Sequence, residues 1–322
     1  MKVFDYLKNF KDSGVLGINR RNAEYMLPSN PRRYYPLVDN KLMTKHLAEQ
    51  ADIPVPPLYA VIEIQQQVKA VAQLLQPYDD FVIKPSRGSG GSGILVIDKQ
   101  VNGLYRQVNG NLLSLHELQH HVSNILAGMY SLGGQSDTAM FEYRVRFDPV
   151  FAAITYQGVP DIRVVVYRSI PVMAMLRLPT RESFGKANLH QGAIGVGIDL
   201  LTGATTFAAR GNSAIDRHPD TRQALVSIVI PHWDRLLLTA ARCCELTGLG
   251  YIGADFVLDS EKGPLMLELN ARPGLNIQIA NRVGLRLRLE AIDQQQNLPQ
   301  DAEECVALSK RLFAASRHGA TI

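Results

Sequence analysis

The sequence predicts an α+β fold in which paired strands alternate with helices along 322 residues. Three stretches have the composition of two neighbouring strands joined by a turn or a glycine loop: residues 81–98, 161–178 and 251–270. Four stretches have helical spacing or composition: residues 41–51, 63–76, 115–129 and 222–246. With 46% hydrophobic residues, the chain can bury a large core, divided between two or three subdomains.

Charge and cysteine content exclude several classes of protein. Lysine and arginine total 34 against 30 acidic residues, and the net charge of +4 is too small to predict a nucleic-acid partner. Cys243, Cys244 and Cys305 lack the number and spacing of a disulfide framework or a metal site, which predicts buried thiols in a reducing compartment. No stretch of the sequence has the roughly 18 uncharged apolar residues that a membrane span requires. We therefore expect a cytoplasmic protein without a membrane span.

The N-terminal part predicts a short leader followed by the first helix. Residues 1–38 are rich in Arg, Asn, Pro and Tyr and lack the pattern of an independent domain. Met43, Leu47 and Ala51 then recur at four-residue steps, which predicts an apolar helix face. Three prolines within residues 53–57 end this helix.

The stretch FVIKPSRGSGGSGILVID (81–98) predicts a glycine hairpin. Its Gly88, Gly90 and Gly93 form a G-x-G-x-x-G pattern, which brings backbone N–H groups close to phosphates in many proteins. A dinucleotide fingerprint would continue into a helix, but a β-branched apolar run follows here; a P-loop would end in Gly-Lys-Ser/Thr. A flap between two strands fits best, with Lys84 at the end of the first strand. A flexible surface turn remains the alternative.

The middle of the chain predicts further strands, a loop and a long helix. Residues 139–148 should form a strand that leads into a loop. Residues 185–197 are polar and contain several glycines, which predicts a mobile loop. The helix over residues 222–246 is expected despite Pro231 near its middle, with Gly248 as its stop. Its apolar stripe is best explained by core packing: Val229, Trp233, Leu237, Ala240 and Cys244.

The stretch YIGADFVLDSEKGPLMLELNARPGL (251–275) predicts a hairpin that carries carboxylates. Strict alternation places Glu268 and Asn270 on one face of the second strand, opposite Leu265, Leu267 and Leu269. Asp255 on the first strand can converge with them into a site of oxygen ligands, which Mg²⁺ prefers. The alternative is an ordinary half-exposed hairpin whose polar face meets water. Arg272 follows immediately where the second strand ends.

These motifs, in this order, resemble the ATP-grasp superfamily. VDNKLMTKHLAEQADIPVPPLY is similar to the segment that opens such domains, and FVIKPSRGSGGSGI resembles their second-lysine strand and flap. GVPDIRVVV, GKANLHQGA and ELNARPGL are most similar to RimK-like glutamate ligases, within which the chain resembles the RimK-related, alpha-L-glutamate ligase-like group. The resemblance covers residues 37–290. It implies two α+β subdomains that clasp ATP, after a much-shortened N-terminal region.

The resemblance also implies domain bounds and ligand contacts. A leader at 1–38 would precede an ATP-grasp domain at 39–295, with a flap subdomain at about 60–140, a metal subdomain at about 145–295 and a C-terminal helix at 296–322. Lys41 and Lys84 would contact the α- and β-phosphates of ATP. The flap backbone over the β- and γ-phosphates would comprise Ser89, Gly90, Gly91, Ser92 and Gly93.

The remaining implied roles concern the base, the ribose, the metal and the substrate. Glu142 would accept the adenine amino group beside the Val145 backbone, and Asp161 would contact the ribose. Two Mg²⁺ ions, with Mn²⁺ as an alternative, would be held by Asp255, Glu268 and Asn270. The carboxylate and the acyl-phosphate charge would be bound by Arg163, Arg177, Lys186, Asn188 and Arg272. Against these roles, Arg163 and Arg177 could be strand-surface residues, and Glu142 could pair with Arg144 or Arg146.

The implied activity is ATP-dependent, ADP-forming carboxylate–amine ligation through an acyl phosphate. Glutamate is the expected amino acid and a peptide or amino acid the expected acceptor; self-association into a homo-oligomer stays open. Two alternatives remain: an ATP-grasp ligase for a sugar-linked or peptidyl precursor, and a non-catalytic nucleotide-binding regulator. RimK-like enzymes carry an N-terminal domain that frames the substrate cleft. The expected leader of about 38 residues is much shorter than such a domain, so the resemblance does not extend to acceptor recognition.

Overall fold

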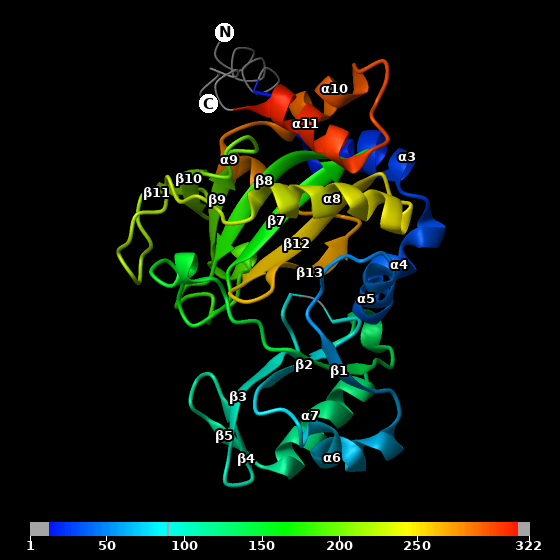
Figure 1. Cartoon of the computed structure of the whole chain (residues 1–322), viewed down its shortest axis with the longest axis vertical. Helices are drawn as coiled ribbons and strands as arrows, with labels where there is room; N and C mark the ends of the chain where they lie inside the picture. Colours follow the sequence, from blue (N-terminus) through cyan, green and yellow to red (C-terminus); the bar gives the residue numbers. More distant parts are fainter. Residues whose placement is uncertain (1–12, 89, 315–322) are drawn as a thin grey trace.

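A computed structural model describes residues 13–88 and 90–314, which form two lobes around separate antiparallel sheets (Figure 1). Each sheet has its own cluster of buried apolar side chains. Helices cover the sheets, so the fold is α+β, as the sequence predicts. The order of elements along the chain brings the first sheet entirely before the second.

The smaller lobe contains a six-stranded sheet in the order β1-β6-β2-β3-β4-β5. Its strands are β1 (Leu58–Ile62), β2 (Phe81–Pro85), β3 (Leu95–Val101), β4 (Leu104–Gln107), β5 (Leu112–Leu113) and β6 (Ala139–Glu142). Its helical elements are η3 (Gln65–Ala70), α6 (Val71–Leu75), α7 (Leu115–Leu126) and η4 (Leu132–Gly134). Leu118, Val122 and Ile125 of α7 lie in the core of this lobe.

The larger lobe contains a seven-stranded sheet in the order β11-β10-β9-β8-β7-β12-β13. Its strands are β7 (Asp161–Tyr167), β8 (Ile170–Leu178), β9 (Ile194–Ile198), β10 (Thr205–Arg210), β11 (Ser213–Ile215), β12 (Tyr251–Asp259) and β13 (Gly263–Asn270). Its helical elements are η5 (Pro149–Phe151), η6 (Leu189–Gln191), α8 (Trp233–Thr247), α9 (Ile277–Asn281), α10 (Leu285–Asp293) and α11 (Ala302–Phe313). The expected hairpins at 161–178 and 251–270 are therefore present.

The segment before the first sheet packs against the larger lobe. It comprises α2 (Ile18–Arg20), η1 (Arg21–Met26), α3 (Leu27–Ser29), η2 (Arg32–Tyr34), α4 (Pro36–Asp39) and α5 (Lys41–Gln50). Asn30 donates to the carbonyls of Tyr251 and Ala271, and Leu16, Tyr25 and Val38 join the larger core. The proposed domain bounds, including the leader at 1–38, remain a prediction, and residues 1–12 lie outside the described part.

The helix expected over residues 222–246 begins only at Trp233. Proline lacks an amide hydrogen and disfavours helical geometry in the residue before it, so Pro231 separates an irregular segment from the helix. Val229 pairs with Ala204 in an isolated bridge and is 59% exposed, so it is not part of the core stripe. Trp233, Leu237, Ala240 and Cys244 are buried as expected, and Gly248 ends the helix at φ 67°.

The first helix and the expected mobile loop also differ from the sequence-based expectation. The buried residues of α5 are Thr44, Lys45 and Ala48, whereas Met43 is exposed. The pattern missed this face because a buried lysine does not count as apolar. Of the expected loop at 185–197, the last part belongs to β9, whose residues Ile194–Ile198 are all buried. Two glycines lie among these residues because α9 packs closely against them: a Cβ on Gly197 would lie 2.4 Å from the Ala280 carbonyl oxygen.

None of the helices within residues 13–88 and 90–314 combines the length and apolar character that a transmembrane helix needs. The three cysteines are free and buried. Of the C-terminal helix expected over 296–322, the structure describes α11, and residues 315–322 lie outside the described part.

Candidate functional site

The glycine hairpin lies between β2 and β3. Gly90, Gly91 and Gly93 have φ angles of 62°, 77° and 76°, which side chains rarely tolerate. A Cβ on Gly93 would lie 2.6 Å from the Tyr130 ring, so glycine is also needed there for space. Ser92 is exposed, and Ser89 lies outside the described residues.

The flap of the smaller lobe meets a loop of the larger lobe. A Cβ built on Gly90 would lie 3.6 Å from Asn188 Nδ2, and one on Gly91 would lie 3.6 Å from Lys186 Cδ. Lys186 is exposed and Asn188 half-buried. The structure therefore brings two predicted substrate contacts, Lys186 and Asn188, against the predicted phosphate flap.

Lys41 connects the flap with the carboxylate hairpin. Its Nζ donates to the Gly88 carbonyl at 2.6 Å and lies 3.2 Å from Glu268 Oε2 on β13. Because Lys41 begins α5, its backbone is also fixed: Asn40 caps this helix, and the Lys41 amide donates to the Ser86 carbonyl. The predicted phosphate-binding lysine, the flap base and the predicted metal-site carboxylate Glu268 therefore converge at one point.

Glu142 is buried at the end of β6 between two lysines. It forms ion pairs with Lys84 of β2 and, at 2.8 Å, with Lys45 of α5. Burial opposes the charged carboxylate, but the two lysines outweigh it and lower the pKa of Glu142. Burial also lowers the pKa of Lys45. This arrangement excludes the alternative pairing of Glu142, since Arg144 and Arg146 pair with Asp80 instead.

Lys45 is a candidate site residue that sequence reasoning missed. It lies one helical turn after Lys41 and is 4% exposed. The four-residue spacing of Lys41 and Lys45 places both on one face of α5, and this spacing was the sequence signal that could have identified Lys45. The predicted adenine neighbour Val145 follows β6 and is half-buried.

The carboxylate hairpin differs from strict alternation by one bulge. Asp255 pairs with Glu268 and Gly253 with Asn270, but the register shifts between Asp255 and Phe256. Leu267 is the extra residue, so Met266 rather than Leu265 shares the core with Leu269. Asp255 lies opposite Glu268 in the register, and Asn270 Nδ2 donates to Asp255 Oδ2 at 3.3 Å. Their role as a set of metal ligands stays a prediction.

Asp255 is also the centre of a buried ion-pair network. Arg163 Nε donates to Asp255 at 2.7 Å, and Arg177 contacts both Asp255, at 2.8 Å, and Asp161. Burial raises the pKa of Asp161 to about 6 despite Arg177. At Asp255 the two guanidinium groups outweigh burial and hold the pKa at about 2. Arg163 and Arg177 are therefore not strand-surface residues. Glycine is needed at position 253 for close packing, because a Cβ there would lie 2.7 Å from Pro273 Cβ.

The side chains of Asp255, Glu268 and Asn270 have the oxygen atoms that Mg²⁺ prefers, but not all of these atoms are free to bind it. Glu268 and the Asn270 carbonyl oxygen are ligands of the kind that Mg²⁺ prefers. Both Asp255 oxygens, in contrast, already accept from arginines. Among the described residues, no group of three or more His, Cys, Asp or Glu side chains is arranged to hold a metal ion. Glu268 and Asn270 are therefore the better-placed ligands.

Arg272 lies two residues after the end of β13. Its guanidinium stacks over the Tyr35 ring at 4.6 Å from the ring centre. Within the described part of the chain, neither Arg272 nor Lys186 has a carboxylate within ion-pair distance. Both side chains are exposed, which leaves their charges available to a substrate.

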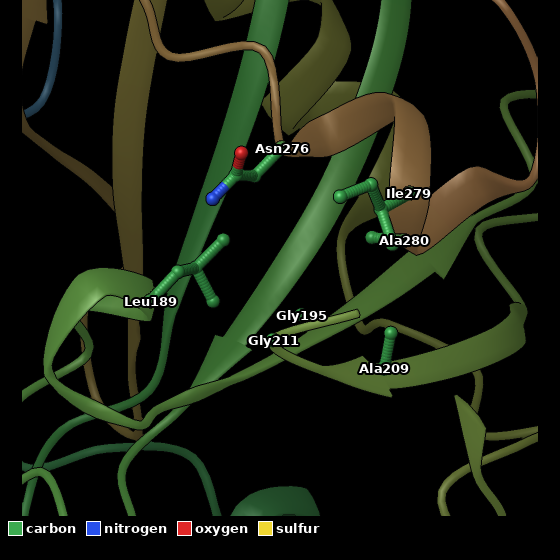
Figure 2. Close-up of a pocket in the computed structure, with 7 residues that line it drawn as sticks. All are labelled: Leu189, Gly195, Ala209, Gly211, Asn276, Ile279 and Ala280. Carbon is green, nitrogen blue, oxygen red and sulfur yellow. The ribbon is translucent and has the colours of Figure 1, made fainter. Parts of the chain in front are cut away.

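A hollow behind the Asn188 loop is separate from these groups. Figure 2 shows Leu189 of η6 facing it from one side, and Asn276 and Ile279 facing it from the N-terminal end and the middle of α9. Its remaining lining consists of Gly195, Ala209, Gly211 and Ala280. No charged side chain lines it, so it does not suit nucleotide phosphates.

A family model described as sugar-transfer associated ATP-grasp matches residues 20–294. The chain belongs to this ATP-grasp family. The ATP-grasp fold expected from the sequence is therefore confirmed. The finer resemblance to the RimK-related group stays a prediction. None of the curated proteins matches the chain.

Solved ATP-grasp structures are similar at low sequence identity. The ATP-grasp ligase PsnB, complexed with minimal precursor, is 15% identical with a TM-score of 0.43, covering 87% of this chain and 63% of that one. The D-alanine–D-alanine ligase from Coxiella burnetii is 12% identical with a TM-score of 0.47, covering 88% and 61%. Biotin carboxylase from Campylobacter jejuni is 15% identical with a TM-score of 0.48, covering 84% and 49%. The chain spans less than two thirds of the length of each of these structures.

Proposed function

We propose that the chain is an ATP-dependent, ADP-forming carboxylate–amine ligase. The observation that carries the proposal is the convergence at Lys41, whose ammonium contacts the flap carbonyl of Gly88 and the Glu268 carboxylate. This convergence supports a site where flap, cation and metal ligands act on the same phosphates. Membership of an ATP-grasp family is consistent with the proposal.

The proposed reaction has two steps. A substrate carboxylate oxygen attacks the ATP γ-phosphorus, the bond to the ADP oxygen breaks, and an acyl phosphate forms. An amine then attacks the acyl carbon, inorganic phosphate leaves, and the amine gives up a proton as the amide forms. Phosphoryl transfer depends mainly on positioning and on neutralisation of charge, so the cations and backbone amides of this site suit it.

The residues divide into nucleotide, metal and substrate contacts. Lys41 and Lys84 would hold the phosphates, with Glu142 and the Val145 backbone at the adenine and Asp161 at the ribose. Glu268 and Asn270 would hold Mg²⁺, and Asp255 would join them if Arg163 and Arg177 gave up their contacts with one Asp255 oxygen. When bound, Mg²⁺ would neutralise phosphate charge.

The substrate carboxylate requires cations that the chain does not already neutralise. Arg163 and Arg177 are balanced by Asp161 and Asp255, so they stabilise the site more readily than they bind a substrate. Lys186, Asn188 and Arg272 are better placed, because their polar groups face the flap or lie exposed at the end of β13. Arg272 can bind a carboxylate through two parallel hydrogen bonds.

We propose glutamate as the amino acid, with polyglutamate or a glutamate-tailed peptide as product. The DIR and N-L-H runs similar to RimK-like enzymes and the two unpaired cations favour a dianionic amino acid. Cytoplasmic localisation and homo-oligomer formation stay predictions of the sequence.

A second candidate is a ligase that acts on a sugar-linked carboxylate. The description of the matching family as sugar-transfer associated favours this candidate. Both candidates share the acyl-phosphate chemistry and differ only in which carboxylate and amine enter the cleft.

Mass spectrometry of the products separates these candidates. The protein is incubated with ATP, Mg²⁺ and a panel of amino acids, with and without uronic acids, and new amide products are identified. We expect a mass increase of one or more glutamyl residues. A product that requires the uronic acid would favour the second candidate. ATP binding without any product from the panel would favour a non-catalytic regulator.

A further inference from the structure

A buried carboxylate, Asp137, lies beneath the glycine flap. It precedes β6, is 6% exposed and has no role in the proposed chemistry. Ser86 Oγ donates to it at 2.6 Å and Ser131 Oγ at 2.7 Å. The backbone amides of Arg87, at 3.1 Å, and Thr138, at 2.7 Å, also donate to it. Both oxygens of the carboxylate are therefore used.

These donors come from both sides of the flap base. Ser86 and Arg87 lead from β2 into the flap, whereas Ser131 belongs to the turn after α7. Gly88 pairs with Ser131 in an isolated antiparallel bridge. Asp137 therefore fastens the first stem of the flap to this turn through side-chain and backbone contacts.

Ser86 also connects Asp137 with Lys41, the first of the two lysines proposed to bind phosphates. The Ser86 carbonyl accepts the backbone amide of Lys41, and the Ser86 amide donates to the Thr138 carbonyl. Asp137 holds the hydroxyl of this same serine. One carboxylate thus sets the position of the flap base relative to Lys41.

The second stem of the flap rests on the same segment of chain. Gly93 packs against the Tyr130 ring, and its carbonyl lies 3.0 Å from His121 Nε2. Because a carbonyl only accepts, Nε2 carries the hydrogen. Burial lowers the pKa of His121, which favours the neutral ring. Residues 121–137 therefore support both ends of the flap.

The Asp137 carboxylate is held by hydrogen bonds from hydroxyl and amide groups. Within residues 13–88 and 90–314, no lysine, arginine or histidine lies within ion-pair distance of it. A buried carboxylate without a counter-cation is stabilised only by its hydrogen bonds. A turn alone does not need such a group, since Ser or Asn satisfies turn amides without a buried charge.

We propose that Asp137 is a positioning residue for the nucleotide phosphates. It does not touch the nucleotide; it fixes the flap base and Lys41 in the geometry that grips the phosphates. This inference rests on the proposed nucleotide site, and it predicts an effect that depends on the presence of phosphates in the ligand.

Calorimetric titration of ATP and adenosine tests the inference. In Asp137→Asn, ATP should bind at least tenfold more weakly, whereas adenosine, which lacks phosphates, should bind within twofold of wild type. Ser131→Ala removes one donor to Asp137 and should weaken ATP binding several-fold with the same selectivity. The matched control is Asp98→Asn, since Asp98 lies on β3 of the same lobe and pairs with Arg106, away from the flap.

Each outcome decides the question. Equal losses for ATP and adenosine, or unchanged ATP affinity, would overturn the positioning role. If Asp137→Asn does not fold, Ser131→Ala decides by the same two ligands. A wild-type protein that does not bind ATP would instead overturn the proposed function, and this result is distinguishable because it requires no variant.

Discussion

Glu142 keeps its charge in a nearly water-free position because Lys45 and Lys84 neutralise it. Its pKa in the folded protein is lower than the usual value near 4.5. The resulting stability is fully present above pH 4.5 and is lost as the pH falls through the folded value. The buried ammonium groups of Lys45 and Lys84 in turn need this carboxylate as their counter-charge.

Glu142→Gln should therefore lower stability at pH 7 by about 3 kcal/mol, since it leaves two buried ammonium groups without a counter-charge. It should also lose less stability than wild type between pH 5 and pH 3. Urea unfolding across this pH range measures both effects. Glu245→Gln, at an exposed glutamate of α8, should change neither. Parallel pH profiles for wild type and Glu142→Gln would contradict the ion-pair account.

Lys84→Met should weaken ATP binding by about 2 kcal/mol, roughly 30-fold in Kd, because a desolvated charge contact with the phosphates is lost. Isothermal titration calorimetry of the folded variant measures this change. Lys99→Met is the matched control, as Lys99 is exposed on β3 of the same lobe. Unchanged ATP affinity in Lys84→Met would remove Lys84 from the nucleotide site.

The β12–β13 hairpin is the element whose chemistry is tested most simply. Glu268→Gln should reduce turnover roughly 100-fold or more while the fold stays intact, because a charge beside the phosphates is lost and the side chain is 32% exposed. Asp255→Asn should also remove turnover, but it should destabilise the protein, since Arg163 and Arg177 lose their shared partner. Steady-state assays and thermal unfolding separate the two variants. Near-normal activity of Glu268→Gln at ordinary Mg²⁺ concentration would exclude the hairpin as the metal site.

The loop between β8 and β9 is the element that should respond to nucleotide. Arg181 and Lys186 are exposed, and Lys186 lies beside the flap. We expect trypsin to cut this loop in the free protein and an ATP analogue with Mg²⁺ to slow the cut. Adenosine alone should protect less, because it brings no phosphates to the flap. Equal cleavage under all three conditions would show that the loop does not order over the nucleotide.

Hairpins were the elements that the sequence predicted best. In 161–178 and 251–270, apolar strands flank short turns, and both pairings are local. The bulge at Leu267 was not predictable, because the Met266 amide is held by the Pro54 carbonyl from outside the hairpin. Lys45 was missed for a similar reason: its partner Glu142 is almost a hundred residues away. Local patterns do not contain such pairings.

At the scale of the whole molecule, the two lobes are joined where Lys41 meets Gly88 and Glu268. These three residues come from distant parts of the chain, so no local pattern predicts that they lie close together. Only the order of the ATP-grasp-like motifs along the sequence indicated it. The N-terminal segment contributes to the larger core through Leu16, Tyr25 and Val38. The sequence did not predict this packing, because short helical turns rich in Arg, Asn and Pro give no clear apolar period.

The nucleotide product tests the central claim most directly. The protein is incubated with ATP, Mg²⁺, glutamate and hydroxylamine, and nucleotides, phosphate and hydroxamate are quantified. The account predicts glutamate-dependent ADP and inorganic phosphate, with an equivalent amount of hydroxamate from the trapped acyl phosphate. ADP released only with carboxylates other than glutamate would keep the mechanism and change the substrate. AMP and pyrophosphate would contradict the proposed mechanism.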